Sequence, residues 1–246
     1  MSTLFDAIRF LTIIPLPGGP GGPPGRASVW FPFVGFALGA ALVVLNWFFG
    51  SFLSHALSAL LTLALWEILT GGLHLDGLAD SLDGFAGRDR PSAIRIMRDS
   101  RIGVFGTAGL ILFFLLKGTA LIDLTGPLRW QALLLAPAVG RATPLLLARS
   151  FRPATPNEGK GSDFMTSVTG WGLGIGLAVT LGGAGLLLWP WGLAVSVVGF
   201  TVAWAWGAFL ARRLGGLTGD GLGGAVELAE LAALLSAAAL QHLKII

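Results

Sequence analysis

Seven long apolar segments constrain this chain more than any other feature of its sequence. Each approaches the roughly 20 mostly apolar residues that a helix needs to cross a bilayer. They cover residues 30–49, 52–70, 104–123, 130–148, 168–188, 192–211 and 225–243. The second and the last are the weakest, because Glu67 lies near the end of one and Glu227 and Glu230 interrupt the other. The sequence therefore predicts an all-α fold, a polytopic membrane helix bundle of about seven transmembrane helices.

The composition also points to a protein that lies in lipid. Hydrophobic residues make up 54% of the chain and charged residues only 12%, about half the charged share of soluble domains. The 37 glycines fit helices that pack closely in a membrane. Because there is no cysteine, disulfides and cysteine nucleophiles are excluded. With no internal repeat and no separate soluble domain, residues 1–246 are expected to form a single integral-membrane catalytic domain.

Residues 1–29 precede the first apolar segment and are expected to form an interfacial N-terminal segment followed by a hinge. The first sixteen residues contain no small-residue cleavage site, which argues against a cleaved signal peptide. Leu4, Ile8 and Leu11 can line one side of a short interfacial helix, and an ordinary helical entry into the first span explains them equally well. Proline and glycine dominate residues 15–26, so no helix is expected there.

Positive charges concentrate on one side of the predicted topology. The N-terminal segment and loops 71–103, 149–167 and 212–224 carry most of the arginines, whereas the opposite loops offer little beyond Arg129. The positive-inside rule therefore places these loops on the cytoplasmic side. The expected location is a bacterial plasma (inner) membrane, with the active site on its cytoplasmic side. The same pattern explains the net charge of +3 as a topology signal. The lipid bilayer is therefore the expected partner of these charges, and no nucleic acid partner is expected.

Three aspartates follow the second segment at helical spacing. Asp76, Asp80 and Asp83 are separated by four and three residues, which places them on one face of a helix, where like charges repel. Oxygen ligands of this kind suit Mg²⁺, a cation that is typically shared with substrate phosphates. His74 can act as a general base or merely line a polar pocket. The alternative is a solvated face that pairs with nearby arginines.

The next stretch, residues 88–106, is predicted to bind phosphate. Arginine forks match phosphate oxygens, and glycines at 103 and 106 allow a ligand or another helix to approach the backbone. The predicted phosphate-binding residues are Arg95, Arg98, Asp99, Arg101 and Gly103. The arginines also suit a second role, contact with lipid headgroups.

A third polar patch lies at residues 212–230. Glycine-rich backbone beside a helix start can cradle phosphate, and Asp220 with Glu227 can complete the metal shell from another helix. A helix C-terminal cap explains part of the glycine pattern equally well. Glu67 is expected to lie behind the metal ligands. Lys117 and Arg141, within apolar segments, need buried partners or a polar interior, although snorkelling alone can suffice for Lys117.

Loop 149–167 is either a mobile lid that carries substrate contacts or a hydrophilic connector. The residues do not decide between these two interpretations.

Three of these stretches together resemble one enzyme family. GGLHLDGLADSLDG at 71–84, MRDSRIGVFG at 97–106 and GGLTGDGLGGAVEL at 215–228 resemble the cobalamin synthase family, and FPFVG at 31–35 resembles its opening. The resemblance implies a membrane enzyme that needs Mg²⁺ and joins adenosylcobinamide-GDP to α-ribazole or its 5′-phosphate, with release of GMP. It assigns the metal to Asp76, Asp80, Asp83, Asp220 and Glu227. Association with other late cobalamin-pathway enzymes is a further expectation.

Two other functions fit parts of the sequence. Residues 80–88 read DxxDGxxGR, close to the start of the CDP-alcohol phosphotransferase motif, although the expected continuation is absent. A transporter would need polar groups near the middle of the bilayer, whereas the sequence concentrates them in the loops.

Overall fold

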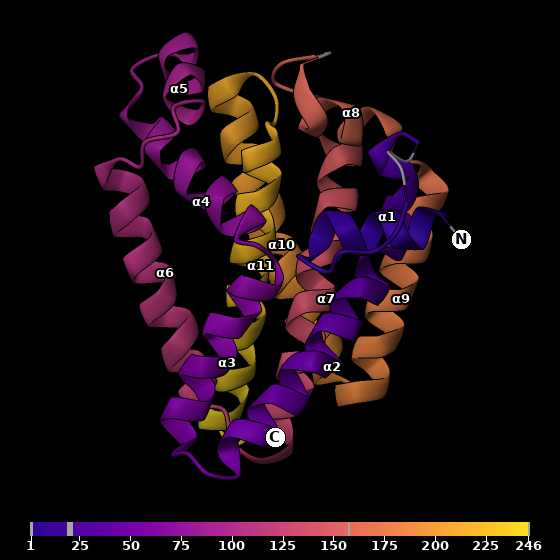
Figure 1. The fold of residues 1–246 in the computed structure, drawn as a ribbon, viewed down its shortest axis with the longest axis vertical. Coiled ribbons are helices and arrows are strands. Elements are labelled where there is room, and N and C mark those ends of the chain that lie inside the picture. The colour runs from indigo at the N-terminus through magenta and orange to yellow at the C-terminus, as the bar shows by residue number, and fades with distance from the viewer. Residues whose placement is uncertain (1, 19–21, 157, 246) are drawn as a thin grey trace.

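The computed structural model describes residues 2–18, 22–156 and 158–245, and every regular element in them is helical (Figure 1). In chain order the elements are α1 (Ser2–Leu11), η1 (Pro24–Trp30), α2 (Phe31–Gly50), α3 (His55–Leu69), α4 (Leu73–Asp83), η2 (Gly84–Ala86), α5 (Arg90–Met97), α6 (Val104–Asp123), α7 (Gly126–Ser150), α8 (Gly159–Ser167), α9 (Gly170–Leu188), α10 (Trp191–Leu214) and α11 (Gly219–His242).

The predicted membrane helix bundle is confirmed. Among the described residues, six helices are long and apolar enough to cross a membrane, namely α2 with η1, α6, α7, α9, α10 and α11. The helix pair α3 and α4 is bent by 88° and raises the number to as many as seven. Helix α3 is shorter than the expected segment 52–70, because Ser54 caps its start by accepting a hydrogen bond from the N–H of Leu57.

The N-terminal segment contains two helices. Helix α1 is separate from the first span, which favours the interfacial interpretation over a continuous entry helix. The expectation that residues 15–26 contain no helix is wrong at its end, since the 3-10 helix η1 begins at Pro24. Proline is tolerated in a first helical turn, where its missing N–H has no partner to lose. Residues 19–21 of this stretch lie outside the described residues.

Helices α7 and α11 form the centre of the bundle. Helix α7 packs against α2, α9, α10 and α11, and α11 packs against α4, α6, α7 and α10. Small residues bring these backbones together: a Cβ added to Gly35 of α2 would lie 2.6 Å from the Cα of Ala138 on α7. Close approach of this kind is how helices gain packing energy in lipid, where burial of apolar surface contributes little.

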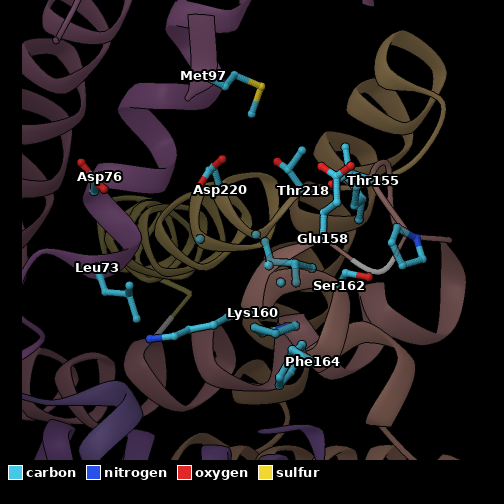
Figure 2. Close-up of a pocket in the computed structure, with 18 of the residues that line it drawn as sticks. Leu73, Asp76, Met97, Thr155, Glu158, Lys160, Ser162, Phe164, Thr218 and Asp220 are labelled. Carbon is cyan, nitrogen blue, oxygen red and sulfur yellow. The ribbon is translucent and has the colours of Figure 1, made fainter. Parts of the chain in front are cut away.

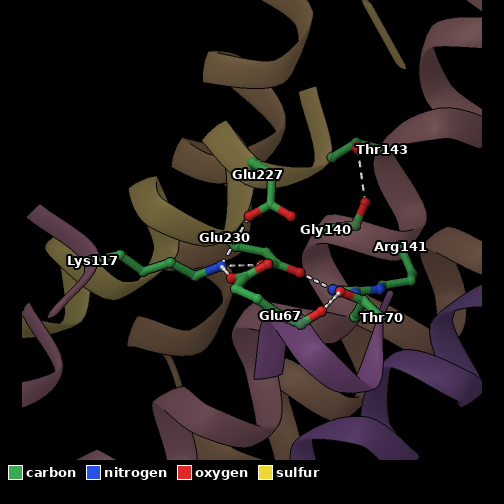
Figure 3. Close-up of polar contacts among 8 residues, drawn as sticks. All are labelled: Glu67, Thr70, Lys117, Gly140, Arg141, Thr143, Glu227 and Glu230. Carbon is green, nitrogen blue, oxygen red and sulfur yellow. Dashed lines mark hydrogen bonds and ion pairs between the residues drawn. The ribbon is translucent and has the colours of Figure 1, made fainter. Parts of the chain in front are cut away.

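A buried cluster of five charged side chains connects α3, α6, α7 and α11 (Figure 3). The Lys117 ammonium donates hydrogen bonds to Glu67 at 2.9 Å, Glu227 at 2.9 Å and Glu230 at 2.8 Å. Arg141 pairs with Glu230 from the other side. The expectation that Lys117 and Arg141 need buried partners is confirmed, and snorkelling is excluded for Lys117, which is completely buried. Polar groups are therefore not confined to the loops.

The helices α1, α5 and α8 and the start of α11 all lie toward the same end of the bundle, and the C-terminus lies at the opposite end (Figure 1). Loops 71–103, 149–167 and 212–224 therefore meet at this end, as the topology predicts.

Replacement of the central cation tests how far the bundle depends on the cluster. We expect Lys117→Met to lower the melting temperature of the detergent-solubilised protein by about 10 °C, because loss of one partner of a buried ion network costs about 3–5 kcal/mol. Tryptophan fluorescence during heating measures this change. Lys244→Met, at an exposed lysine near the C-terminus, is the control and should melt like the unmodified protein. Adding Glu227→Gln to Lys117→Met should restore part of the loss, and a further decrease would contradict this account.

Candidate active site

A cavity of about 670 Å³ lies where the loops meet (Figure 2). Its wall combines the end of α1, the start of α2, the helices α4, α5 and α8, and the start of α11. The volume falls within the range of about 300–1,000 Å³ that is usual for small-molecule sites. Of the predicted site residues, His74, Asp76, Arg98 and Asp220 line this cavity.

Two glycines direct α4 into this wall. Gly71 and Gly72, directly after α3, have φ of +64° and +65°, a left-handed conformation that residues with a Cβ rarely adopt. This turn produces the 88° bend between α3 and α4. Helix α4 then packs on the start of α11, where a Cβ on Gly77 would lie 2.8 Å from the carbonyl oxygen of Asp220. The bend therefore brings the aspartates of α4 beside Asp220.

The carboxylates of α4 and α11 interact electrostatically. Burial and, after it, the negative charges of Asp76, Asp220 and Asp83 together raise the pKa of Asp80 to about 7. Within residues 2–18, 22–156 and 158–245, no three His, Asp or Glu side chains are grouped closely enough to hold a metal ion by themselves. The donors nevertheless fit Mg²⁺, which usually takes one or two carboxylates and completes its shell with water and substrate phosphate. Asp76 and Asp220 both face the cavity and meet that requirement.

Asp83 has a different set of contacts from Asp76 and Asp80. It is buried, and its two oxygens accept hydrogen bonds from the backbone N–H of Gly103 at 2.7 Å and of Gly106 at 2.8 Å. These groups belong to the N-terminus of α6, which has unpaired donors. A Cβ on either glycine would lie within 2.5 Å of the Asp83 carboxylate. Asp83 thus connects α4 to α6, and Gly103 contacts this carboxylate instead of lining the cavity.

Glu227 and Glu67 lie apart from the cavity lining. Both carboxylates bind Lys117, so the structure does not bring Glu227 to the aspartates as the spacing of α11 had suggested. The physical reason is that a buried ammonium requires carboxylate partners more strongly than a solvated metal site does. Glu67 belongs to the charged cluster, and we leave Glu227 out of the candidate cation site.

The predicted phosphate-binding residues divide into two groups. Arg98 lines the cavity and forms an ion pair of 2.6 Å with Glu158. Arg101 instead donates to Asp99 through two hydrogen bonds of 3.0 and 2.7 Å, and the pKa of Asp99 falls to about 2 because of them. Neither of these two residues is among the described residues of the cavity lining, and Arg95 is not among them either.

The start of α11 supplies backbone to the cavity. Thr218 caps the helix by accepting a hydrogen bond of 3.0 Å from the N–H of Gly221, and Thr218, Gly219 and Asp220 all line the cavity. The first N–H groups of a helix attract anions. Within the glycine-rich patch at residues 212–230, Gly215 forms the helix C-terminal cap that the sequence offered as the alternative, since it has φ of +73° and follows the last residue of α10. The patch thus contains both a helix end and a helix start.

The segment between α7 and α9 is fixed to the bundle at several points. The N–H of Ala154 donates to the carbonyl of Leu217 at 2.7 Å, and Arg90 donates to the carbonyl of Ala154 at 2.6 Å. Beyond these contacts, α8 lines the cavity with residues that sequence reasoning did not assign to the site: Lys160, Ser162 and Phe164. The segment therefore contributes to the wall and is more than a connector.

His74 lines the cavity and lies near enough to the charged cluster to feel its positive charges. Burial, together with the positive charges of Arg141 and Lys117, lowers the pKa of His74 well below its usual value, so the ring is neutral. Its Nδ1 is buried and has no hydrogen-bond partner among the described residues. His74 thus brings a buried polar atom, without a partner in the described part of the chain, close to the cavity that the residue lines.

Comparison with known proteins gives one consistent result. The family model for cobalamin-5-phosphate synthase matches residues 3–238. A relative from Pseudomonas fluorescens, named adenosylcobinamide-GDP ribazoletransferase, is 40% identical over 97% of this chain and 99% of its own length. Relatives of the same name from Geotalea daltonii and Herpetosiphon aurantiacus are 35% and 38% identical, each over 96% of both chains. No solved structure matches the chain. The chain therefore belongs to the cobalamin-5-phosphate synthase family and is a transferase of cobalamin biosynthesis, as its motifs predicted.

Proposed function

We propose that the cavity joins adenosylcobinamide-GDP to α-ribazole, or to its 5′-phosphate, with Mg²⁺ held by Asp76 and Asp220. Joining of adenosylcobinamide-GDP and ribazole is the family's reaction, so the proposal concerns where it takes place and what supports it. The observation that carries it is the meeting of carboxylates from α4 and α11, far apart in sequence, at one cavity. The charges of Asp76, Asp220 and Asp83 raise the pKa of Asp80, and a cation at Asp76 and Asp220 would offset this repulsion.

The reaction forms one phosphorus–oxygen bond and breaks another. The α-ribazole hydroxyl attacks the phosphorus nearest the cobinamide, the bond to the bridging oxygen breaks, and GMP leaves with that oxygen. When bound, Mg²⁺ neutralises charge on the phosphoryl oxygens. Arg98 and Lys160, both in the cavity wall, supply further positive charge for the phosphates. The hydroxyl proton passes to His74 or to one of the aspartates, and both alternatives remain open.

The proposal includes a location for the site. The cavity lies at the arginine-rich end of the bundle, which by the positive-inside rule faces the cytoplasm across a bacterial plasma membrane. Other late enzymes of the cobalamin pathway would reach the site from this end, and their association with this chain belongs to the same proposal.

A turnover assay tests the cation site. We expect detergent-solubilised protein to form GMP and the corrinoid product from adenosylcobinamide-GDP and α-ribazole only with Mg²⁺, and EDTA to abolish the reaction. Asp76→Asn and Asp220→Asn should each lower kcat by about a hundredfold or more, as loss of key transition-state stabilisation does. The matched control is Asp123→Asn, at the end of α6 far from the cavity, which should react normally. Full activity of both cavity variants, or turnover of a CDP-alcohol in place of the corrinoid, would refute the proposal.

Asp83 should differ from Asp76 in stability. Asp83→Ala leaves the buried N–H of Gly106 and the partly buried N–H of Gly103 without acceptors, at about 1–3 kcal/mol each, so we expect a melting temperature about 5–15 °C lower. Asp76→Ala removes one of several like charges, and its melting temperature should stay the same or rise. Thermal melting in detergent without Mg²⁺ compares the two variants. Equal melting temperatures would return Asp83 to the set of candidate metal ligands.

A further inference from the structure

Three phenylalanine rings form one wall of the cavity. Phe10 ends α1, Phe31 begins α2 and Phe164 lies on α8, and all three line the cavity. Their ring centroids are 5.6–6.5 Å apart, and their planes differ by only 2–15°. Residues from three separate parts of the chain therefore stack nearly parallel aromatic rings on one another at the edge of the same cavity. We call Phe10, Phe31 and Phe164 the phenylalanine wall.

The phenylalanine wall lies across the cavity from the carboxylates. Figure 2 shows Phe164 on the opposite side from Asp76 and Asp220, with Lys160 between them. Phe31 and Phe164 are almost completely buried, whereas Phe10 is 37% exposed. The cavity thus has a charged side that suits phosphate and an apolar, flat side that suits an aromatic ring.

We propose that the phenylalanine wall binds the base of α-ribazole. This inference rests on the proposed function and deepens it by assigning one substrate to one side of the cavity. The base is a flat bicycle with two methyl groups and a single ring nitrogen free to accept a hydrogen bond. Such a ring can stack on phenyl faces at almost no cost in lost hydrogen bonds. Its ribose hydroxyl then points toward the carboxylate side, where the phosphorus must lie.

The guanine of adenosylcobinamide-GDP fits this wall less well. Guanine carries several donors and acceptors along its edges, and polar groups held against phenyl rings would lose their partners in water. The polar side chains Thr155, Glu158 and Thr218 lie toward the other side of the cavity in Figure 2. The chemistry of the two sides therefore favours α-ribazole at the phenylalanine wall.

Replacement of Phe10 tests the assignment, because this ring is partly exposed and its loss should not unfold the protein. Phe10→Leu keeps apolar volume and removes the aromatic face. We expect the KM for α-ribazole, and its Kd from calorimetric titration without the second substrate, to rise about three- to tenfold, the usual contribution of one aromatic stack. The kcat and the KM for adenosylcobinamide-GDP should stay within about twofold, since the phosphate side is unchanged.

Two further variants make the result decisive. Phe33→Leu is the matched control, because Phe33 is 42% exposed, packs on Trp30 and is not in the cavity lining. Phe10→Tyr keeps the ring face and should bind α-ribazole far better than Phe10→Leu. An unchanged Kd for α-ribazole in Phe10→Leu overturns the assignment, and so does equal loss in Phe10→Tyr. A rise in the KM for adenosylcobinamide-GDP instead would assign the wall to guanine. Calorimetric titration needs no turnover. Weaker α-ribazole binding by Phe10→Leu would therefore support binding of α-ribazole at the phenylalanine wall even if the unmodified protein forms no product.

Discussion

The hydrogen bonds from Lys117 to three glutamates determine how the rest of the structure is arranged. They fix α3, α6 and α11 relative to one another, and Arg141 adds α7. Asp220 lies seven residues before Glu227, which is nearly two helical turns and about 10 Å along the same face of α11. With Glu227 held toward α6, Asp220 is held toward α4. A contact inside the bundle thus sets the direction of a side chain at its end.

The bend after α3 brings the aspartates of α4 beside the start of α11. A straight continuation of α3 would carry Asp76 and Asp80 away from α11 along the direction of the span. Gly71 and Gly72 instead turn α4 by 88° onto the glycine-rich start of α11, where Gly77 and Gly223 leave room for close packing. Asp83 then fixes the far end of α4 to the start of α6. The like charges on α4 are tolerated because both ends of this helix are held by other contacts.

The sequence predicted most of the fold and part of the site. Apolar length located the spans, and the spacing of Asp76, Asp80 and Asp83 correctly placed them on one helix. Their different contacts could not be read from spacing, since the partners of Asp83 are backbone groups 20 and 23 residues away. The same holds for Glu227. The periodicity of α11 predicted which face of the helix carries this residue, but not that its partner is Lys117 on α6, 110 positions away. Phe10 and Phe164 carried no signal at all, because phenylalanines in an apolar chain are ordinary.

The two sides of the cavity follow from its place in the bundle. The side chains of the charged cluster contact one another inside the bundle, so the cavity gains its polar character from the loops and helix starts, through Asp220, Arg98 and Lys160. Its apolar character comes from α1, α2 and α8, which pack their rings together near the end of the bundle. Helix α1 closes this side by contributing Phe10. An N-terminal helix that lies across the bundle, and not within it, is therefore what gives the cavity an aromatic surface beside its charged one.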